Sequence, residues 1–419
     1  MKLFNSIKKN VSKSQRRIIS NFFSLSVLEV VNYLIPIFLI PYLIKIFGIS
    51  KFGEYMFALS FIQYFVILID FGFNYVATRE IAKNRLDKNK ISTIFSSVSF
   101  IKLILLGISF VVFLGIINVF EIFEDTKMFL LIFGIIIGHA FFPLYIFQGL
   151  ERMKKMVIIN VFPKLISLFL ILLLVKNNED FYIFIFITSL GYVVSGVIGF
   201  LYVLIYYANI QKTSWSSIKN IFIISKDVFF ANSASTLYLN SNTFILGFVS
   251  GFNVVGIYSV AEKTVRVTRY IVTPLTQALF PHYSLKFSNQ VFLTSKLEIY
   301  NLAKKITPFL VVIVLGLFIF VDYIVGVLYG VPNPEISNCI YIMGLVIIIG
   351  TYNNILGVLG YVNLDLEKKF RNLILYTGIF NLIMITILGY KFGYIGGAIT
   401  FLLSEIVLFS LLNKNFKIN

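Results

Sequence analysis

Long apolar runs, separated by short polar segments, repeat along the whole chain. A helix of about 20 apolar residues is long enough to cross the hydrocarbon core of a bilayer. Runs of this length predict twelve spans, near residues 20–45, 54–78, 92–120, 127–149, 156–176, 181–207, 220–249, 254–281, 300–328, 336–361, 370–390 and 394–412. Because no connection is long enough for a separate soluble domain, the pattern predicts an all-α integral membrane protein.

The connections between the predicted spans are alternately rich and poor in basic residues. The basic residues gather in the N-terminal segment and in every second connection, at Arg79, Lys83, Arg85, Lys88 and Lys90, at Arg152, Lys154 and Lys155, at Lys212 and Lys219, at Lys286 and Lys296, and at Lys368, Lys369 and Arg371, with Lys414 and Lys417 after the last span. The alternate connection over 121–127 is net acidic. Lysine and arginine mark the cytoplasmic side of short loops. We therefore predict a multi-pass protein with both termini in the cytoplasm.

Composition supports the membrane assignment. The chain of 419 residues is 58% hydrophobic and 13% charged, with a net charge of +17, whereas soluble domains carry about 25% charged residues. The positive charge lies in short loops between apolar spans, so binding to nucleic acid is not expected. The sequence has no nucleotide-binding or hydrolase motif and two histidines. It therefore predicts no cofactor, no metal site and no enzyme activity.

The stretch over 251–281 is long enough to span the bilayer, yet four charged residues lie near its middle, Glu262, Lys263, Arg266 and Arg269. At about 100° per residue, the four fall within about one third of the helix circumference. Tyr258 and Tyr270 lie on the same face. A cation near the bilayer centre costs about 2.5–3.5 kcal/mol on insertion scales, so three on one face need a polar cavity or a ligand. We hypothesise that this face lines a water-filled cavity and binds an anionic substrate.

Other ionisable residues lie at membrane depth, at Glu29, Asp70, Lys102, His139, Lys164, Lys226, Asp227, Asp322 and Glu405. Each is either functional or a side chain that snorkels to the interface or pairs with a neighbour. Lys226, Asp227 and Asp322 lie near span ends, where snorkelling is favoured. For the deeper Glu29, Lys102 and Lys164 both interpretations stay open. We expect Glu405 to be a structural carboxylate paired within the second half, and His139 to be a packed residue.

The seventh predicted span is unusually polar in its middle, at Asn232, Ser233, Ser235, Thr236, Tyr238, Asn240 and Asn242. Such residues either form hydrogen bonds between membrane helices or contact a sugar in a cavity, and the pattern leaves both alternatives open.

A short motif, G-x-Y-x-x-A, opens the second span at 53–58 and the eighth at 256–261. Six spans per half keep both copies in the same orientation, which indicates a parallel internal repeat. We therefore predict an N-terminal lobe over 1–210, with spans 1–6, and a C-terminal lobe over 211–419, with spans 7–12.

Short motifs along the whole chain resemble those of a transporter family. They are N-x-x-x-P at 32–36, P-Y-L at 41–43, F-G at 52–53 with Tyr55, D-F-G at 70–72 followed by T-R-E-I-A at 78–82, V-G-I-Y at 255–258 with Ala261 and Lys263, and F-G-Y-I-G-G-A at 392–398. The chain resembles the Wzx-type polysaccharide flippases, a branch of the MOP superfamily that also holds the MATE drug exporters and the lipid II flippase. The resemblance implies two six-helix lobes in a V shape around a central cationic cavity.

The resemblance also implies a function and roles for residues. The expected cargo is an undecaprenyl-pyrophosphate-linked oligosaccharide, of the O-antigen or capsule type, moved across the inner membrane without a cofactor. The pyrophosphate would bind Lys263 and Arg266, with Arg269 and Arg79 nearer the cytoplasmic entrance and Lys102 and Lys164 as further cations. Sugar-contacting or cavity residues would be Asn32, Asn240, Asn242, Tyr258 and Tyr270, and carboxylates that couple transport to protons or sodium would be Glu29, Asp70 and Glu262. Membrane lipids and a polysaccharide polymerase are the implied partners.

Two other functions remain as alternatives. An ion-coupled multidrug exporter of the same superfamily would favour an acidic cavity for its cationic substrates, whereas the central balance here is basic. A membrane-embedded polysaccharide polymerase or ligase would carry a sizeable outer loop, whereas the predicted outer connections are short.

Overall fold

The computed structural model describes the backbone over residues 13–270, 292–329, 333–364 and 366–415, with residues 276, 279, 283, 286 and 287. Within these ranges it describes all side chains except those at 13–27, 29, 30, 32–34, 37, 231, 232, 234, 235, 237–239, 270, 292–296, 328 and 415. The described backbone is helical, and its regular elements are α2 (Lys13–Asp70), α3 (Phe73–Lys83), α4 (Lys88–Val119), η1 (Glu121–Phe123), α5 (Thr126–Ile132), α6 (Gly134–Phe141), α7 (Leu144–Gly149), α8 (Met153–Leu174), η2 (Asn178–Asp180), α9 (Phe181–Tyr206), α10 (Trp215–Ser250), α11 (Phe252–Tyr270), α13 (Phe292–Tyr329), α14 (Pro334–Met343), α15 (Leu345–Asn354), η3 (Ile355–Val362) and α16 (Glu367–Asn415).

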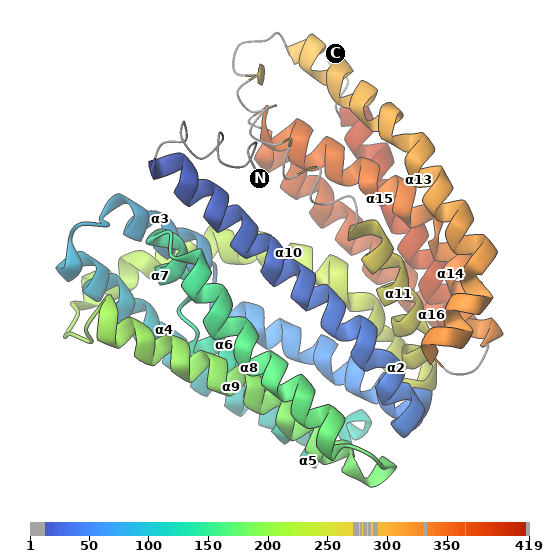
Figure 1. Cartoon of the computed structure of the whole chain (residues 1–419), viewed down its shortest axis with the longest axis horizontal. Helices are drawn as coiled ribbons and strands as arrows, with labels where there is room; N and C mark the ends of the chain where they lie inside the picture. The colour runs from blue at the N-terminus through green and yellow to red at the C-terminus, as the bar shows by residue number, and fades with distance from the viewer. Residues whose placement is uncertain are drawn as a thin grey trace, which may run out of the picture. The chain divides into compact units, whose positions relative to one another are not determined.

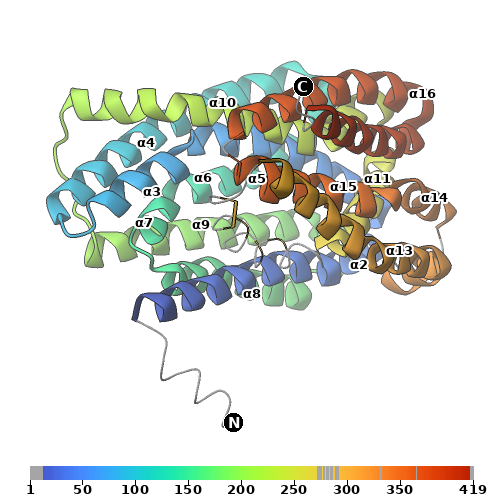
Figure 2. The same ribbon diagram turned by 90° about the horizontal axis from the view of Figure 1, so that it is seen from above.

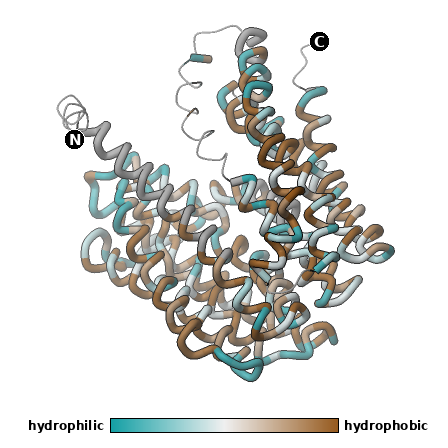
Figure 3. The backbone as a smooth tube through the Cα atoms, turned by 45° about the vertical axis from the view of Figure 1, so that its right-hand side comes forward, coloured by the Kyte–Doolittle hydropathy of each residue, from teal (hydrophilic) through white to brown (hydrophobic). Residues whose placement is uncertain are grey.

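Eight helical segments of the described chain are long and apolar enough to cross a membrane, namely Phe38–Lys83, Lys88–Val119, Thr126–Gly149, Met153–Leu174, Asn178–Tyr206, Leu297–Val327, Pro334–Val362 and Glu367–Lys414. Figure 3 shows their hydrophobic character, with the hydrophilic stretches mainly near the connections. The helices α2 and α16 each consist of two shorter helices that join at a glycine with a positive φ. This glycine is Gly48 in α2 and Gly393 in α16. These two helices therefore each cover two of the twelve predicted spans. The predicted seventh and eighth spans correspond to α10 and α11, and the four charges of α11 set it apart from the apolar segments.

The chain forms two compact units. Unit 1 contains Met1–Leu39 and Tyr64–Asn232, and unit 2 contains Ile40–Gln63 and Ser233–Asn419. In unit 1, α9 packs against both α8 and α6, and the three helices lie side by side in two views (Figures 1 and 2). The predicted division into lobes at residue 210 stays a prediction.

In unit 2, the two copies of the G-x-Y-x-x-A motif pack against each other. A Cβ atom at Gly53 would clash with the carbonyl oxygen of Phe252 and would lie 2.6 Å from the amide nitrogen of Gly256. A Cβ atom at Gly256 would clash in turn with the carbonyl oxygen of Ile49. Each glycine thus meets the carbonyl four residues before the other glycine, so the contact is reciprocal. Glycine is required here because it lets two membrane helices approach at backbone distance.

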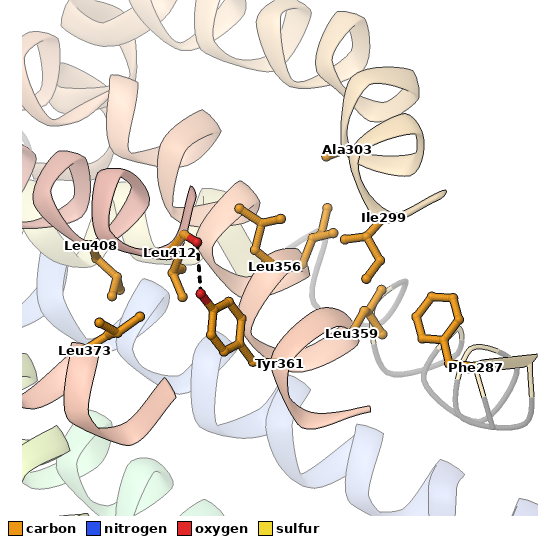
Figure 4. Close-up of a cluster of buried hydrophobic side chains, with 10 residues drawn as sticks. Phe287, Ile299, Ala303, Leu356, Leu359, Tyr361, Leu373, Leu408 and Leu412 are labelled. Atoms are coloured by element: carbon orange, nitrogen blue, oxygen red, sulfur yellow. Dashed lines mark hydrogen bonds between the residues drawn. The ribbon is translucent and has the colours of Figure 1, made fainter. Parts of the chain in front are cut away.

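A cluster of buried apolar side chains from α13, η3 and α16 packs together in unit 2 (Figure 4). The π-helix η3 contributes Leu356, Leu359 and Tyr361, which pack with leucines of α16. The Tyr361 hydroxyl donates a hydrogen bond of 2.9 Å to the carbonyl oxygen of Leu412. This contact satisfies a buried hydroxyl and ties η3 to the end of α16.

Candidate functional site

The charged face of α11 lies within unit 2, where α11 packs against α14, α15 and α16. Glu262 and Arg266 are one helical turn apart, and they form an ion pair. The Nε and Nη2 atoms of Arg266 donate to Oε1 of Glu262 at 3.1 and 2.8 Å. The guanidinium also lies 5.2 Å from the centre of the Phe401 ring, in a cation–π contact. Because the Glu262 side chain is 8% exposed, this pair is largely shielded from solvent.

Arg269 is bound to the two helices that face it. Its Nη1 donates to Oε1 of Glu405 at 2.8 Å, and its Nη2 donates to the carbonyl oxygen of Gly350 at 2.7 Å. The other carboxylate oxygen of Glu405 accepts a bond of 2.6 Å from the amide of Asn353. A Cβ atom at position 350 would lie 2.5 Å from the guanidinium, so glycine makes room for it. The expected pairing of Glu405 within the second half is confirmed.

Lys263 differs from the two arginines. Its ammonium makes no hydrogen bond or ion pair with any residue in the described part of the chain, and its side chain is partly exposed. Arg266 and Arg269 each have a carboxylate partner. Glu262 lies four residues before Arg266 on α11, whereas the charge pattern of α11 could not indicate the partner of Arg269, because Glu405 lies on a distant segment. Lys263 is therefore the cation of α11 that forms no ion pair among the described residues. The roles of all three cations toward a substrate stay predictions.

Asn242 and Tyr258, two of the predicted sugar-contacting residues, lie in a buried hydrogen-bond network. The amide nitrogen of Asn242 donates to the Tyr258 hydroxyl at 3.0 Å, and its amide oxygen accepts from Asn381 at 2.8 Å. Asn381 in turn accepts from the Ser404 hydroxyl at 2.7 Å. Because Tyr258 is 0% exposed, this network connects α10, α11 and α16 rather than a cavity. Of the two interpretations of this polarity, hydrogen bonding between helices therefore describes Asn242, while Asn240 is partly exposed.

Unit 1 contains a cavity of about 220 Å³ between its helices. Residues of α2, α3, α6, α7, α8 and α9 and of the segment between α6 and α7 surround it, namely Leu28, Asp70, Asn74, Gly138, His139, Phe142, Leu144, Met156, Asn160, Lys164, Tyr192 and Ser195. The ammonium of Lys164 donates to the amide oxygen of Asn160 at 3.0 Å and lies 4.7 Å from the centre of the Tyr192 ring. The ring of His139 stacks on Tyr192 at 5.7 Å. Helices far apart in sequence thus bring a lysine, a histidine and a carboxylate to one cavity.

Lys102 lies beside this cavity, with 2% of its surface exposed. Its ammonium donates to Oδ1 of Asp70 at 3.2 Å and to the carbonyl oxygen of His139 at 3.1 Å. Of the two interpretations left open for Lys102, pairing with a neighbour is therefore the one that describes its contacts. Asp70 is paired as well, although 27% of its side chain stays exposed.

The remaining predicted site residues lie apart. Arg79 is on α3, with 58% of its side chain exposed and its Nε 3.4 Å from Glu80. The side chains of Glu29, Asn32 and Tyr270 lie outside the described ones. Sequence patterns alone missed Asn353, Asn381 and Ser195, because a single amide or hydroxyl in an apolar span has no distinguishing signal.

Solved structures of other transporters share this fold. An inward-facing multidrug-resistance MATE transporter of the MOP superfamily matches with a TM-score of 0.70 at 12% sequence identity, covering 93% of this chain and 94% of that one. The lipid II flippase MurJ, in an inward closed conformation, matches with a TM-score of 0.72 at 12% identity, covering 93% of this chain and 86% of that one. At such low identity the likeness shows the fold, so the protein has the all-helical, MATE-like membrane fold of these transporters.

The chain belongs to the polysaccharide biosynthesis protein family, whose model matches residues 18–285. A relative from Escherichia coli (strain K12), named "Putative O-antigen transporter", is 27% identical over 407 residues, covering 94% of this chain and 95% of the relative. The predicted membership of the polysaccharide transporter branch of the superfamily is confirmed.

Proposed function

We propose that this protein is a flippase that moves an undecaprenyl-pyrophosphate-linked oligosaccharide, an O-antigen or capsule-type repeat unit, from the cytoplasmic to the outer leaflet of the inner membrane. It would do so by alternating access between the predicted lobes over 1–210 and 211–419, as a transporter and not as an enzyme. The family, the name of the Escherichia coli relative and a fold shared with a lipid II flippase support the proposal. A polysaccharide polymerase would then receive the translocated lipid.

The single observation that carries the proposal is that Lys263 forms no ion pair with a described residue. Its neighbours Arg266 and Arg269 form ion pairs within unit 2, whereas its ammonium forms no hydrogen bond or ion pair with a described residue. An unpaired cation on a membrane helix is costly and marks a site of function. An ammonium group binds phosphate as a mobile point charge. We therefore assign the pyrophosphate contact to Lys263.

Glu262 offers a route to ion coupling. When a pyrophosphate binds beside Lys263, it would compete with Glu262 for the guanidinium of Arg266, because a guanidinium readily donates two parallel hydrogen bonds to phosphate oxygens. The released carboxylate would then be available to pair with the coupling ion, a proton or a sodium ion. Substrate binding and ion binding would thus be linked through the Glu262–Arg266 pair.

The loop charges predict the orientation, and labelling of introduced cysteines tests it. Cys339 is buried and is the one cysteine of the chain, so a Cys339→Ser variant is a clean background. We expect Glu124→Cys, in an exposed outer connection, to react with a membrane-impermeant maleimide in intact cells. We expect Leu86→Cys, in the basic connection between α3 and α4, to react only after the inner membrane is permeabilised. The reverse pattern would overturn the proposed topology.

Complementation tests the transport function. A bacterial strain that lacks its own O-antigen flippase accumulates lipid-linked repeat units and loses surface polysaccharide. We expect this chain to restore at least part of the surface polysaccharide, measured by gel analysis, and to lower the lipid-linked pool. Restored resistance to cationic drugs, with no change in polysaccharide, would instead identify a multidrug exporter and would contradict the proposal.

A further inference from the structure

The cavity of unit 1 contains polar atoms that lack partners. The hydroxyl of Ser195, a residue 2% exposed, and the amide oxygen Oδ1 of Asn74 are buried and have no hydrogen-bond partner in the described part of the protein. Buried polar groups in proteins are nearly always hydrogen-bonded. Two such atoms at one cavity therefore indicate that the cavity takes a polar ligand, with at least one group that accepts and one that donates.

The net charge of the side chains at the cavity narrows the chemical class of the ligand. Lys102 and Asp70 neutralise each other. Lys164 has an amide oxygen and the face of a tyrosine ring as contacts, neither of which carries a formal charge, and it makes no ion pair with a described residue. Among the described side chains at the cavity, and with the His139 imidazole neutral, one positive charge is therefore in excess. A single carboxylate balances this charge, whereas a pyrophosphate diester carries more than one negative charge.

The size and the walls of the cavity are suited to one sugar ring. Its volume of about 220 Å³ is below the roughly 300–1,000 Å³ of pockets for drug-sized ligands, so an oligosaccharide does not fit. Phe142 and the stacked rings of His139 and Tyr192 provide flat apolar surface. Such surface, with a few polar groups that fix orientation, is typical of small-molecule sites and matches the C–H face of a pyranose.

We propose that this cavity is a subsite for one acidic sugar residue, a pyranose ring that bears a carboxylate. Lys164 binds the carboxylate, the Ser195 hydroxyl donates to a ring oxygen or hydroxyl, and Asn74 Oδ1 accepts a hydrogen bond from a sugar hydroxyl. The proposal deepens the proposed function and rests on it, because it assigns an acidic sugar to the transported repeat unit. It also gives Lys164 a role different from that of the pyrophosphate contact at Lys263.

Binding to the purified full-length protein in nanodiscs tests the subsite. We would titrate glucuronate, glucose and acetate and follow binding by saturation-transfer NMR, which detects weak ligands. We expect glucuronate to bind saturably and at least about tenfold more tightly than either glucose or acetate, because only glucuronate combines the charge with the ring. Equal binding of all three, or no binding of glucuronate, would overturn the assignment.

Variants then locate the site. We expect Lys164→Gln to weaken glucuronate binding about tenfold or more and Lys164→Arg to weaken it less, since arginine keeps the charge. Lys154→Gln, at an exposed position of the same helix, is the matched control and should bind as the unaltered protein does. Ser195→Ala keeps every charge and serves as a second variant if Lys164→Gln fails to fold; it should weaken glucuronate binding severalfold. Unchanged glucuronate binding by a folded Lys164→Gln variant would exclude the cavity as the binding site. If Lys164→Gln does not fold, unchanged binding by Ser195→Ala would exclude it.

The binding and complementation experiments fail independently. If the protein binds glucuronate but does not restore surface polysaccharide, the flippase proposal fails and the acidic-sugar site stands. If it restores surface polysaccharide but does not bind glucuronate, only the subsite assignment is overturned.

Discussion

Lys263→Glu is expected to abolish export of surface polysaccharide, whereas Lys263→Arg should retain most of it. The physical reason is that Lys263 is the cation of α11 that forms no ion pair with a described carboxylate. A glutamate would repel the pyrophosphate and would also lie next to Glu262. Lys263→Ala should lower the transport rate by about 10- to 150-fold, which corresponds to the loss of one charge-assisted hydrogen bond of about 1.5–3 kcal/mol.

Surface polysaccharide and the lipid-linked pool in complemented cells measure this effect, with the protein level followed by immunoblot. Lys304→Glu is the matched control, because it introduces the same charge reversal at an exposed position of α13 in the same unit. It should leave export close to normal. Normal export by Lys263→Glu would remove Lys263 from the site, and equal losses for Lys263→Arg and Lys263→Glu would indicate that the length of the side chain matters more than its charge.

Glu405→Ala is expected to destabilise the protein by about 3–5 kcal/mol, because it leaves the guanidinium of Arg269 without its carboxylate in a largely buried position. The two side chains are 22% and 3% exposed, so water compensates little of the loss. Asn353 would also lose its acceptor on the Glu405 side chain. The thermal unfolding midpoint of the protein in detergent, followed by tryptophan fluorescence or by aggregation, measures the effect.

The double variant Arg269→Met with Glu405→Leu separates pairing from substrate binding. It removes both charges together, and apolar side chains of similar size often replace a buried ion pair without loss of stability. We therefore expect it to recover most of the unfolding midpoint that Glu405→Ala loses. Lys83→Ala, which removes a surface pair with Glu80 on α3, should change stability by less than about 1 kcal/mol. A Glu405→Ala variant as stable as the unaltered protein would show that the pair is not structural.

Some contacts were open to prediction because their residues are neighbours along one helix. Glu262 and Arg266 are separated by four positions, so the sequence already places them on one face. The repeated glycines at 53 and 256 were visible as a motif, but their packing against each other was not. That Arg269 pairs with Glu405, 136 residues later, and Lys102 with Asp70 on another helix depends on how helices pack. A charge pattern along one segment cannot supply that information.

By itself the sequence determined that this is a helical membrane protein of a polysaccharide transporter family, with a set of charges at membrane depth. Apolar run length, loop charge and short motifs are local properties, and a bilayer allows few structures besides helices. Only the tertiary structure decided which of those charges have partners on other helices: Arg269 and Lys102 are paired in this way, whereas Lys263 and Lys164 make no ion pair among the described residues. The cavity around Lys164 likewise exists only because helices far apart in the chain pack together. The reason is physical: an ion pair or a cavity exists only where several helices meet, and one segment does not encode its neighbours.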